Sequence, residues 1–140
     1  MSDEAAGRTH VFFYGLFMDE DLLRTKGVDP QSRELAAVDG FALRIGQRAT
    51  LVHSPGATVH GVVVSLTLSE LDRLYSDPSV QAYRPQAVLA RLTGGGTIAA
   101  VCYNLPCAPS PNDHNPEYAA KLKAVAQKIG LPAEYVASLV

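Results

Sequence analysis

The sequence lacks the features that would place the protein outside the cell, in a membrane or on a nucleic acid. It has two cysteines, Cys102 and Cys107, which are too few for the disulfide framework of a small secreted domain. No apolar run approaches the roughly 20 residues of a membrane span, and the acidic, polar residues 1–4 are unlike a secretory signal. No basic block is present and the net charge is -2, so we expect no surface for nucleic acids or anionic membranes. These absences predict a cytoplasmic protein.

The common motifs of catalysis and cofactor binding are also absent. There is no Walker loop, no dinucleotide fingerprint and no Gly-x-Ser-x-Gly elbow. The four histidines are scattered, and no pair has the spacing of metal ligands on one helix face. The run Gly94-Gly95-Gly96 lies between two strand-like segments, which favours a hairpin loop over a phosphate cradle. We therefore expect neither a metal ion nor a cofactor.

What is present fits one soluble globular domain, since 47% of the 140 residues are hydrophobic and 19% are charged. We expect a flexible N-terminus over residues 1–9 and a single domain over residues 10–140. Strand-like segments are short and are interrupted by turn residues such as Asp39-Gly40 and Ser54-Pro55-Gly56. They do not alternate regularly with helices. The sequence therefore predicts an α+β domain with a small mixed or barrel-like sheet.

The individual elements follow from local signals. Strands are expected at 11–14, 35–38, 41–45, 49–52, 59–66, 87–92 and 97–105. Thr67 and Glu70 form the pattern of a capping box at the start of a helix that ends near Tyr75. Asn115 is placed to cap a C-terminal helix that stops at Gly130. Helical turns are also expected after residue 19 and after residue 132, and residues 105–115, rich in Pro, Ser and Asn, are expected to form a surface loop.

One segment of the first strand suggests a binding site. The run Tyr14-Gly15-Leu16-Phe17 ends an apolar strand at a glycine and leads into a short helix. Such a junction leaves backbone N–H groups unpaired, and a nest of amides suits a carboxylate or another small anion. A plain tight turn is the alternative interpretation.

The order of these signals resembles the γ-glutamylcyclotransferase-like family, which includes AIG2-like proteins and γ-glutamylamine cyclotransferases. The segment 12–18, Phe-Phe-Tyr-Gly-Leu-Phe-Met, is similar to the family's opening Tyr-Gly loop. Segments 48–51 and 59–63 are similar to its middle strands, and 66–74 to its Leu-Asp helix. The resemblance implies a small mixed β-barrel with flanking helices. It also implies cleavage of γ-glutamyl amines or peptides to 5-oxoproline and a free amine, with the γ-glutamyl head held by the Tyr-Gly loop.

The chain departs from this family at the catalytic position. The resemblance implies a glutamate as general acid–base three residues beyond the Asp of the Leu-Asp pair, here Leu71-Asp72, but that position holds Tyr75. An unperturbed phenol has a pKa of about 10 and is a poor base at neutral pH. Asp77, just past the helix end, is a candidate substitute carboxylate. Tyr75 and Asp77 are therefore the candidate catalytic residues, although Tyr75 could equally be an aromatic lid on an inherited pocket.

Two functional hypotheses follow. The first is a cyclotransferase-like enzyme acting on γ-glutamyl compounds, and the second is a non-catalytic module that binds a small carboxylate or metabolite on the same fold. In both, the expected partner is a small-molecule γ-glutamyl or carboxylate ligand. The candidate binding residues are Tyr14, Gly15, Leu16, Phe17, Tyr83 and Tyr103. The sequence leaves the oligomeric state open.

Overall fold

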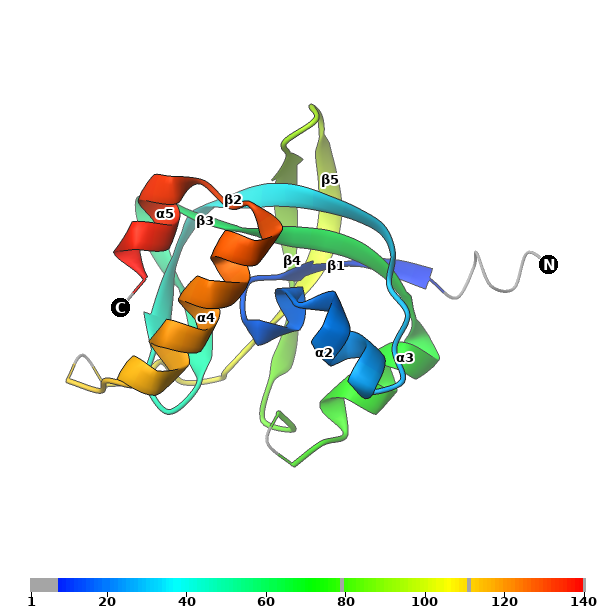
Figure 1. The fold of residues 1–140 in the computed structure, drawn as a ribbon, viewed down its shortest axis with the longest axis horizontal. Coiled ribbons are helices and arrows are strands. Elements are labelled where there is room, and N and C mark those ends of the chain that lie inside the picture. The colour runs from blue at the N-terminus through cyan, green and yellow to red at the C-terminus, as the bar shows by residue number, and fades with distance from the viewer. Residues whose placement is uncertain (1–7, 79, 111, 140) are drawn as a thin grey trace.

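Five strands close into a barrel in the computed structural model, which describes residues 8–78, 80–110 and 112–139 (Figure 1). The strands are β1 (Arg8–Phe13), β2 (Gln31–Ile45), β3 (Ala49–Thr67), β4 (Arg84–Leu92) and β5 (Thr97–Asn104). Their order around the barrel is β1-β3-β2-β4-β5. Neighbours pair antiparallel except β1 and β5, which pair in parallel at Val11 and Val101 and complete the ring. This mixed barrel confirms the predicted α+β fold class.

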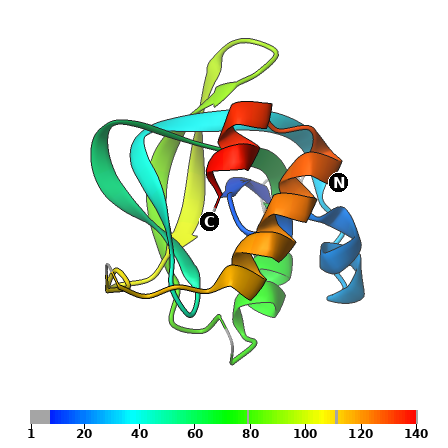
Figure 2. The same ribbon diagram turned by 60° about the vertical axis from the view of Figure 1, so that its left-hand side comes forward.

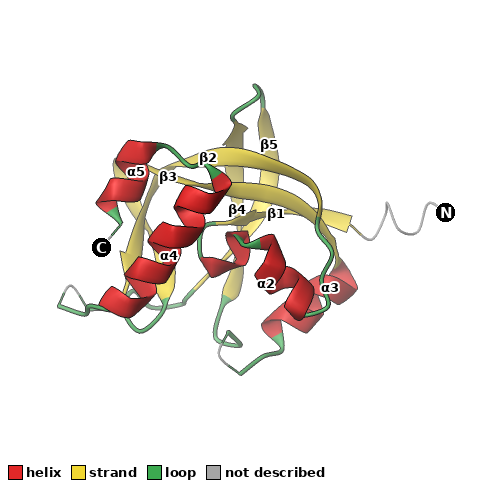
Figure 3. Ribbon diagram, in the orientation of Figure 1, coloured by secondary structure: helices red, strands yellow, loops and turns green. Residues whose placement is uncertain are grey.

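Helices cover one side of the barrel, as the turned view shows (Figure 2). They are the 3-10 turn η1 (Leu16–Met18) and the helices α2 (Glu20–Thr25), α3 (Leu68–Tyr75), α4 (Pro116–Ile129) and α5 (Ala133–Ser138). Figure 3 separates these helices from the strands by colour and shows α4 lying across the barrel beside η1. Within the described residues, no helix is long and apolar enough to cross a membrane.

The second half of the first strand is apolar because both of its faces are buried there. Val11 and Phe13 pack with residues of the helices, while Phe12 and Tyr14 pack inside the barrel. Successive side chains of a strand point to opposite faces. A strand between two apolar layers therefore carries apolar residues on both faces, and its sequence shows no alternation of polar and apolar residues. The same reason explains the run Val62-Val63-Val64 at the centre of β3, whose three side chains are all buried.

The helix ends carry the caps that the sequence predicts. Thr67 and Glu70 form the reciprocal capping box of α3, with bonds of 2.9 and 3.1 Å. The Asn115 side chain accepts from the Tyr118 amide at the start of α4, and Gly130 ends that helix with φ +86°. These predictions depend on local geometry alone, which is why they are confirmed.

The predicted breaks in β2 and β3 are wrong. Asp39-Gly40 makes no tight turn but a shift of register, and β2 continues through it to Ile45. Opposite, β3 pairs at His53 and again at Thr58, so residues 54–57 bulge out of the ladder between them. A proline is tolerated there because its missing N–H is not needed for pairing. The real turn of this hairpin lies at residues 46–48.

The N-terminal prediction can be compared only in part. Residues 1–7 of the expected flexible segment 1–9 lie outside the described residues. Arg8 and Thr9 belong to β1 and pair with Thr67 and Leu66, so for these two the expectation is wrong. The division into one domain over residues 10–140 stays a prediction.

A glycine allows β1 and β3 to approach closely beneath the helices. A Cβ atom built on Gly61 would lie 2.1 Å from the carbonyl oxygen of Phe13 and 3.0 Å from the ring of Phe12. No real side chain fits in that space. Gly61 therefore fixes where β1 ends and where the following loop begins.

Candidate functional site

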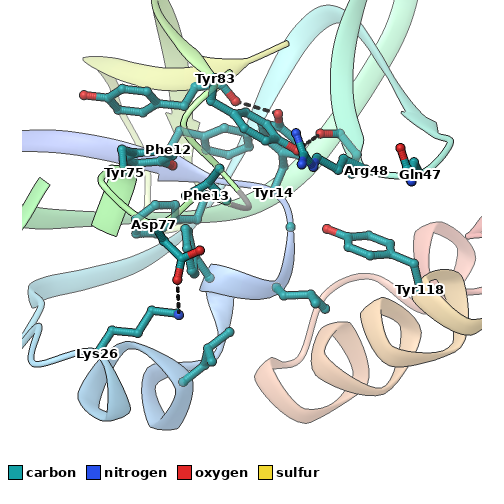
Figure 4. Close-up of a pocket in the computed structure, with 17 residues that line it drawn as sticks. Phe12, Phe13, Tyr14, Lys26, Gln47, Arg48, Tyr75, Asp77, Tyr83 and Tyr118 are labelled. Carbon is teal, nitrogen blue, oxygen red and sulfur yellow. Dashed lines mark hydrogen bonds and ion pairs between the residues drawn. The ribbon is translucent and has the colours of Figure 1, made fainter. Parts of the chain in front are cut away.

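A pocket opens where β1 ends, between α2, the end of α3 and the tip of the β2–β3 hairpin (Figure 4). Its volume of about 380 Å³ lies within the range of small-molecule sites. All the candidate site residues named from the sequence line it: Tyr14, Gly15, Leu16, Phe17, Tyr75, Asp77, Tyr83 and Tyr103. Their roles stay predictions, but the fold brings all of them to one cavity.

The loop after β1 is anchored by a buried hydrogen bond network. The hydroxyl of Tyr14 donates to the carbonyl of Tyr103 at 2.6 Å and to Asn104 Oδ1 at 3.0 Å. The same Asn104 oxygen accepts from the Leu51 amide at 3.3 Å. Asn104 in turn donates to Gln86 at 2.7 Å. Tyr14 is thereby tied to β5 and β3, and the residues after it leave the barrel at a fixed position.

A phenol from α4 lies beside this loop. Burial raises the pKa of the Tyr118 hydroxyl, and the backbone of Leu16 partly opposes that rise. That hydroxyl lies close enough that a Cβ on Gly15 would be 3.0 Å away. The Tyr118 hydroxyl therefore lies beside the backbone that an incoming anion would contact, and the expected nest of free amides stays a prediction.

Tyr75 ends α3 with its ring in the pocket wall. It stacks on Tyr103 with ring centroids 4.0 Å apart and planes 19° apart, and it meets the edge of Phe17 at 5.9 Å. Burial raises the pKa of Tyr75 far above that of a free phenol, and the neighbouring hydroxyls of Tyr103 and Tyr83 raise it further. Tyr75 is therefore a neutral proton donor at physiological pH, and it cannot act as a pre-ionised base.

The other pocket phenols behave in the same way. Burial raises the pKa of Tyr14 and that of Tyr83. The Tyr83 hydroxyl also donates a short hydrogen bond to the Ala49 carbonyl, and the positive charge of Arg48 partly opposes the rise in its pKa. The phenols of the cavity wall are thus neutral at physiological pH.

No uncommitted carboxylate stands at the reacting centre among the described residues. Asp77 is the one carboxylate that lines the pocket, and its Oδ2 lies 3.7 Å from Lys26 Nζ. Glu70 accepts from the amides of Thr67 and Asp29 at 2.9 and 2.8 Å, outside the pocket lining. Glu70 is therefore used to join α3 to the segment before β2, as its place in a capping box predicts.

Sequence reasoning missed several residues of the lining. They are Phe12, Phe13, Leu22, Lys26, Gln47, Arg48, Ala49, Val80 and Tyr118. Phe12 and Phe13 were named as strand residues and as the start of the Tyr-Gly segment, but not as binding residues. Nothing local marks Tyr118 or Arg48 as pocket residues, since they come from elements distant in sequence. Within the described part of the chain, no group of three or more His, Cys, Asp or Glu side chains could hold a metal ion.

Comparison with known proteins shows the family and the fold. Residues 11–121 match a family model described as "Gamma-glutamyl cyclotransferase, AIG2-like". A solved structure named gamma-glutamyl cyclotransferase is similar with a TM-score of 0.79 at 24% identity, over 94% of this chain and 86% of its own. An uncharacterized protein from Homo sapiens has a TM-score of 0.78 at 25% identity, over 95% and 86%. YkqA from Bacillus subtilis has a TM-score of 0.78 at 22% identity, over 99% of this chain and 55% of its own. No curated protein sequence matches the chain.

Proposed function

The chain belongs to the gamma-glutamyl cyclotransferase, AIG2-like family, and from this premise we propose that it cleaves γ-glutamyl amines or peptides to 5-oxoproline and a free amine. The observation that carries the proposal is the meeting of Tyr75 and the loop Tyr14–Phe17 in one cavity. Bound there, the γ-glutamyl head would face backbone amides on one side and a neutral phenol on the other.

The reaction needs little from the protein besides positioning. The α-amine of the substrate attacks its own γ-carbonyl, a C–N bond forms in the new ring, and the original γ-amide C–N bond breaks. Holding the attacking and attacked atoms together contributes several kcal/mol of barrier lowering. The α-ammonium must first lose a proton to the solvent, and transfer into the cavity favours that loss because desolvation disfavours the charged form.

Tyr75 would then relay the remaining proton. As the leaving nitrogen departs, the phenol gives it a proton and takes one from the nitrogen that has attacked, so that Tyr75 ends the cycle unchanged. A phenol with a raised pKa suits a concerted relay because the free phenolate never has to form. This role replaces the carboxylate that the family resemblance implies at the same position.

The test is formation of 5-oxoproline from a γ-glutamyl amine and a γ-glutamyl dipeptide. Tyr75→Phe removes the relay and keeps the ring, so turnover should fall roughly 10²- to 10⁴-fold. Tyr135→Phe is the matched control, because it makes the same chemical change at a buried hydroxyl outside the pocket lining. Unchanged turnover in Tyr75→Phe would refute the relay, and no turnover by the wild type would refute the enzyme.

A second candidate function is binding without catalysis. The neutral Tyr75 and the pairing of Asp77 with Lys26 support a receptor for a γ-glutamyl or other small carboxylate ligand. A receptor would be stabilised thermally by γ-glutamyl compounds without releasing 5-oxoproline. Tyr75→Glu separates the two: gain of turnover from a silent wild type would identify a binding protein that kept the fold and lost the base.

A further inference from the structure

Arg48 stands at the pocket on a rigid support. It lies at the turn of the β2–β3 hairpin, where the Gly46 amide donates to the Arg48 carbonyl at 3.0 Å. The Asn115 side chain donates to the Gln47 carbonyl at 3.3 Å, and a Cβ on Gly46 would lie 2.5 Å from Pro109. The tip is thus held against the loop before α4. Its arginine is presented to the cavity from a fixed backbone.

The charge of Arg48 is not balanced by the protein. Among the residues that the structure describes, no carboxylate forms an ion pair with it, whereas Lys26 and Asp77 lie 3.7 Å apart and balance each other. Figure 4 shows Arg48 beside Tyr14 and Tyr83, on the opposite side of the pocket from Lys26 and Asp77. The pocket therefore carries one uncompensated positive charge, fixed at one side.

A γ-glutamyl amine of a simple alkylamine has no second anionic group that could pair with Arg48. Its head has one carboxylate and one ammonium, and its leaving half has no charge, so the bound compound would leave Arg48 unpaired. A γ-glutamyl amino acid brings a second carboxylate on the leaving half. A guanidinium binds a carboxylate through two parallel hydrogen bonds, which adds geometric selectivity to the charge interaction.

We propose that Arg48 binds a carboxylate on the leaving half of the substrate and so selects γ-glutamyl amino acids over γ-glutamyl amines. The inference rests on the proposed function, because it places the γ-glutamyl head at the loop Gly15–Phe17. It narrows the proposed substrates to compounds that carry two carboxylates. Arg48, at the hairpin tip, would bind the second carboxylate.

The experiment compares γ-glutamyl-alanine with γ-glutamyl-ethylamine, which differ by the carboxylate alone. Calorimetric titration gives the ratio of their dissociation constants for the wild type, Arg48→Gln, Arg48→Lys and Arg44→Gln. Arg44 lies on the same hairpin, opposite Thr50, and does not line the pocket, so Arg44→Gln removes the same charge without the contact. Unfolding midpoints of all four proteins show that each is folded.

The wild type should bind the carboxylated compound roughly tenfold to a hundredfold more tightly, the range of a charged hydrogen bond. Arg48→Gln should bring the ratio close to one, Arg48→Lys should keep a reduced preference, and Arg44→Gln should keep the full one. A wild type that binds both compounds equally, or an Arg48→Gln protein that keeps the ratio, would overturn the inference and leave the proposed function standing. A wild type that binds neither compound would refute the proposed function, and this inference with it.

Discussion

The bond between Tyr14 and Asn104 should be measurable as a coupling free energy. Both side chains are buried, at 5% and 6% exposure. Tyr14→Phe removes one hydroxyl donor, whose acceptors are the Tyr103 carbonyl and Asn104 Oδ1. Asn104 Oδ1 keeps the Leu51 amide as a donor, so we expect a loss of about 1–2 kcal/mol in the free energy of unfolding.

Asn104→Ala should be worse, because it removes more than one bond. It leaves the Leu51 amide without its side-chain acceptor, takes away the partner of Gln86 and opens a small cavity in the barrel. A loss of about 2–4 kcal/mol follows from adding these contributions. For a domain of this size, each kcal/mol lowers the melting temperature by roughly 4 °C.

The double variant, Tyr14→Phe with Asn104→Ala, gives the coupling free energy between the two side chains. Each single substitution already breaks the Tyr14–Asn104 bond, so the double variant should lose about 1 kcal/mol less than the sum of the two. Urea unfolding followed by circular dichroism measures all four proteins. Additivity within about 0.5 kcal/mol would show that the bond contributes nothing, and the anchoring of the Tyr-Gly loop would need another cause.

Three further predictions concern the barrel, the phenols and the start of α3. Gly61→Ala should lower the free energy of unfolding by about 3 kcal/mol or more because its methyl would overlap the Phe13 carbonyl, whereas Gly94→Ala, with nothing closer than 4.0 Å, should be nearly neutral in the same urea titration. All six tyrosines have a raised pKa, so ultraviolet titration at about pH 10 should show less phenolate in the native protein than in the urea-unfolded chain; equal amounts in the two states would contradict this. Burial alone would raise the pKa of Glu70, but hydrogen bonds from backbone amides and from Thr67 lower it on balance; its contribution is present above about pH 4.3 and is lost as the pH falls, so Glu70→Gln should flatten the acid side of the stability profile.

Local signals in the sequence were enough for the helices and the hairpin of β4 and β5. The Thr67 cap, the Asn115 cap and the stop at Gly130 each depend on a few neighbouring residues, and the structure confirms all three. The long strands β2 and β3 were not recognised, because residues 54–57 have turn composition. Only pairing with β2 on both sides of that segment keeps it within one strand.

The candidate site also has residues that could be predicted from the sequence and residues that could not. Tyr14 and its loop could be predicted because an apolar strand stopped at a glycine, and Tyr75 because the resemblance to the γ-glutamylcyclotransferase-like family places the catalytic position there. Tyr118 and Arg48 could not, because their contacts with the cavity join segments far apart in the chain. The pairing of Asp77 with Lys26 was likewise invisible, since it joins the end of α3 to the end of α2. Such contacts depend on how the helices dock on the barrel.

The seating of the hairpin tip against the loop before α4 has an evolutionary consequence. Gly46 and Gln47 lie against Pro109 and Asn115 of the loop before α4, and Gln47 and Arg48 line the cavity. The pairing of β2 with β3 begins directly behind this tip, at Ile45 and Ala49. Exchanging these two short segments together would therefore replace the rim without disturbing the pairing beneath it. We expect proteins that share this fold to differ in substrate specificity mainly at these two segments. The same segments are where an engineered protein could be given a new specificity.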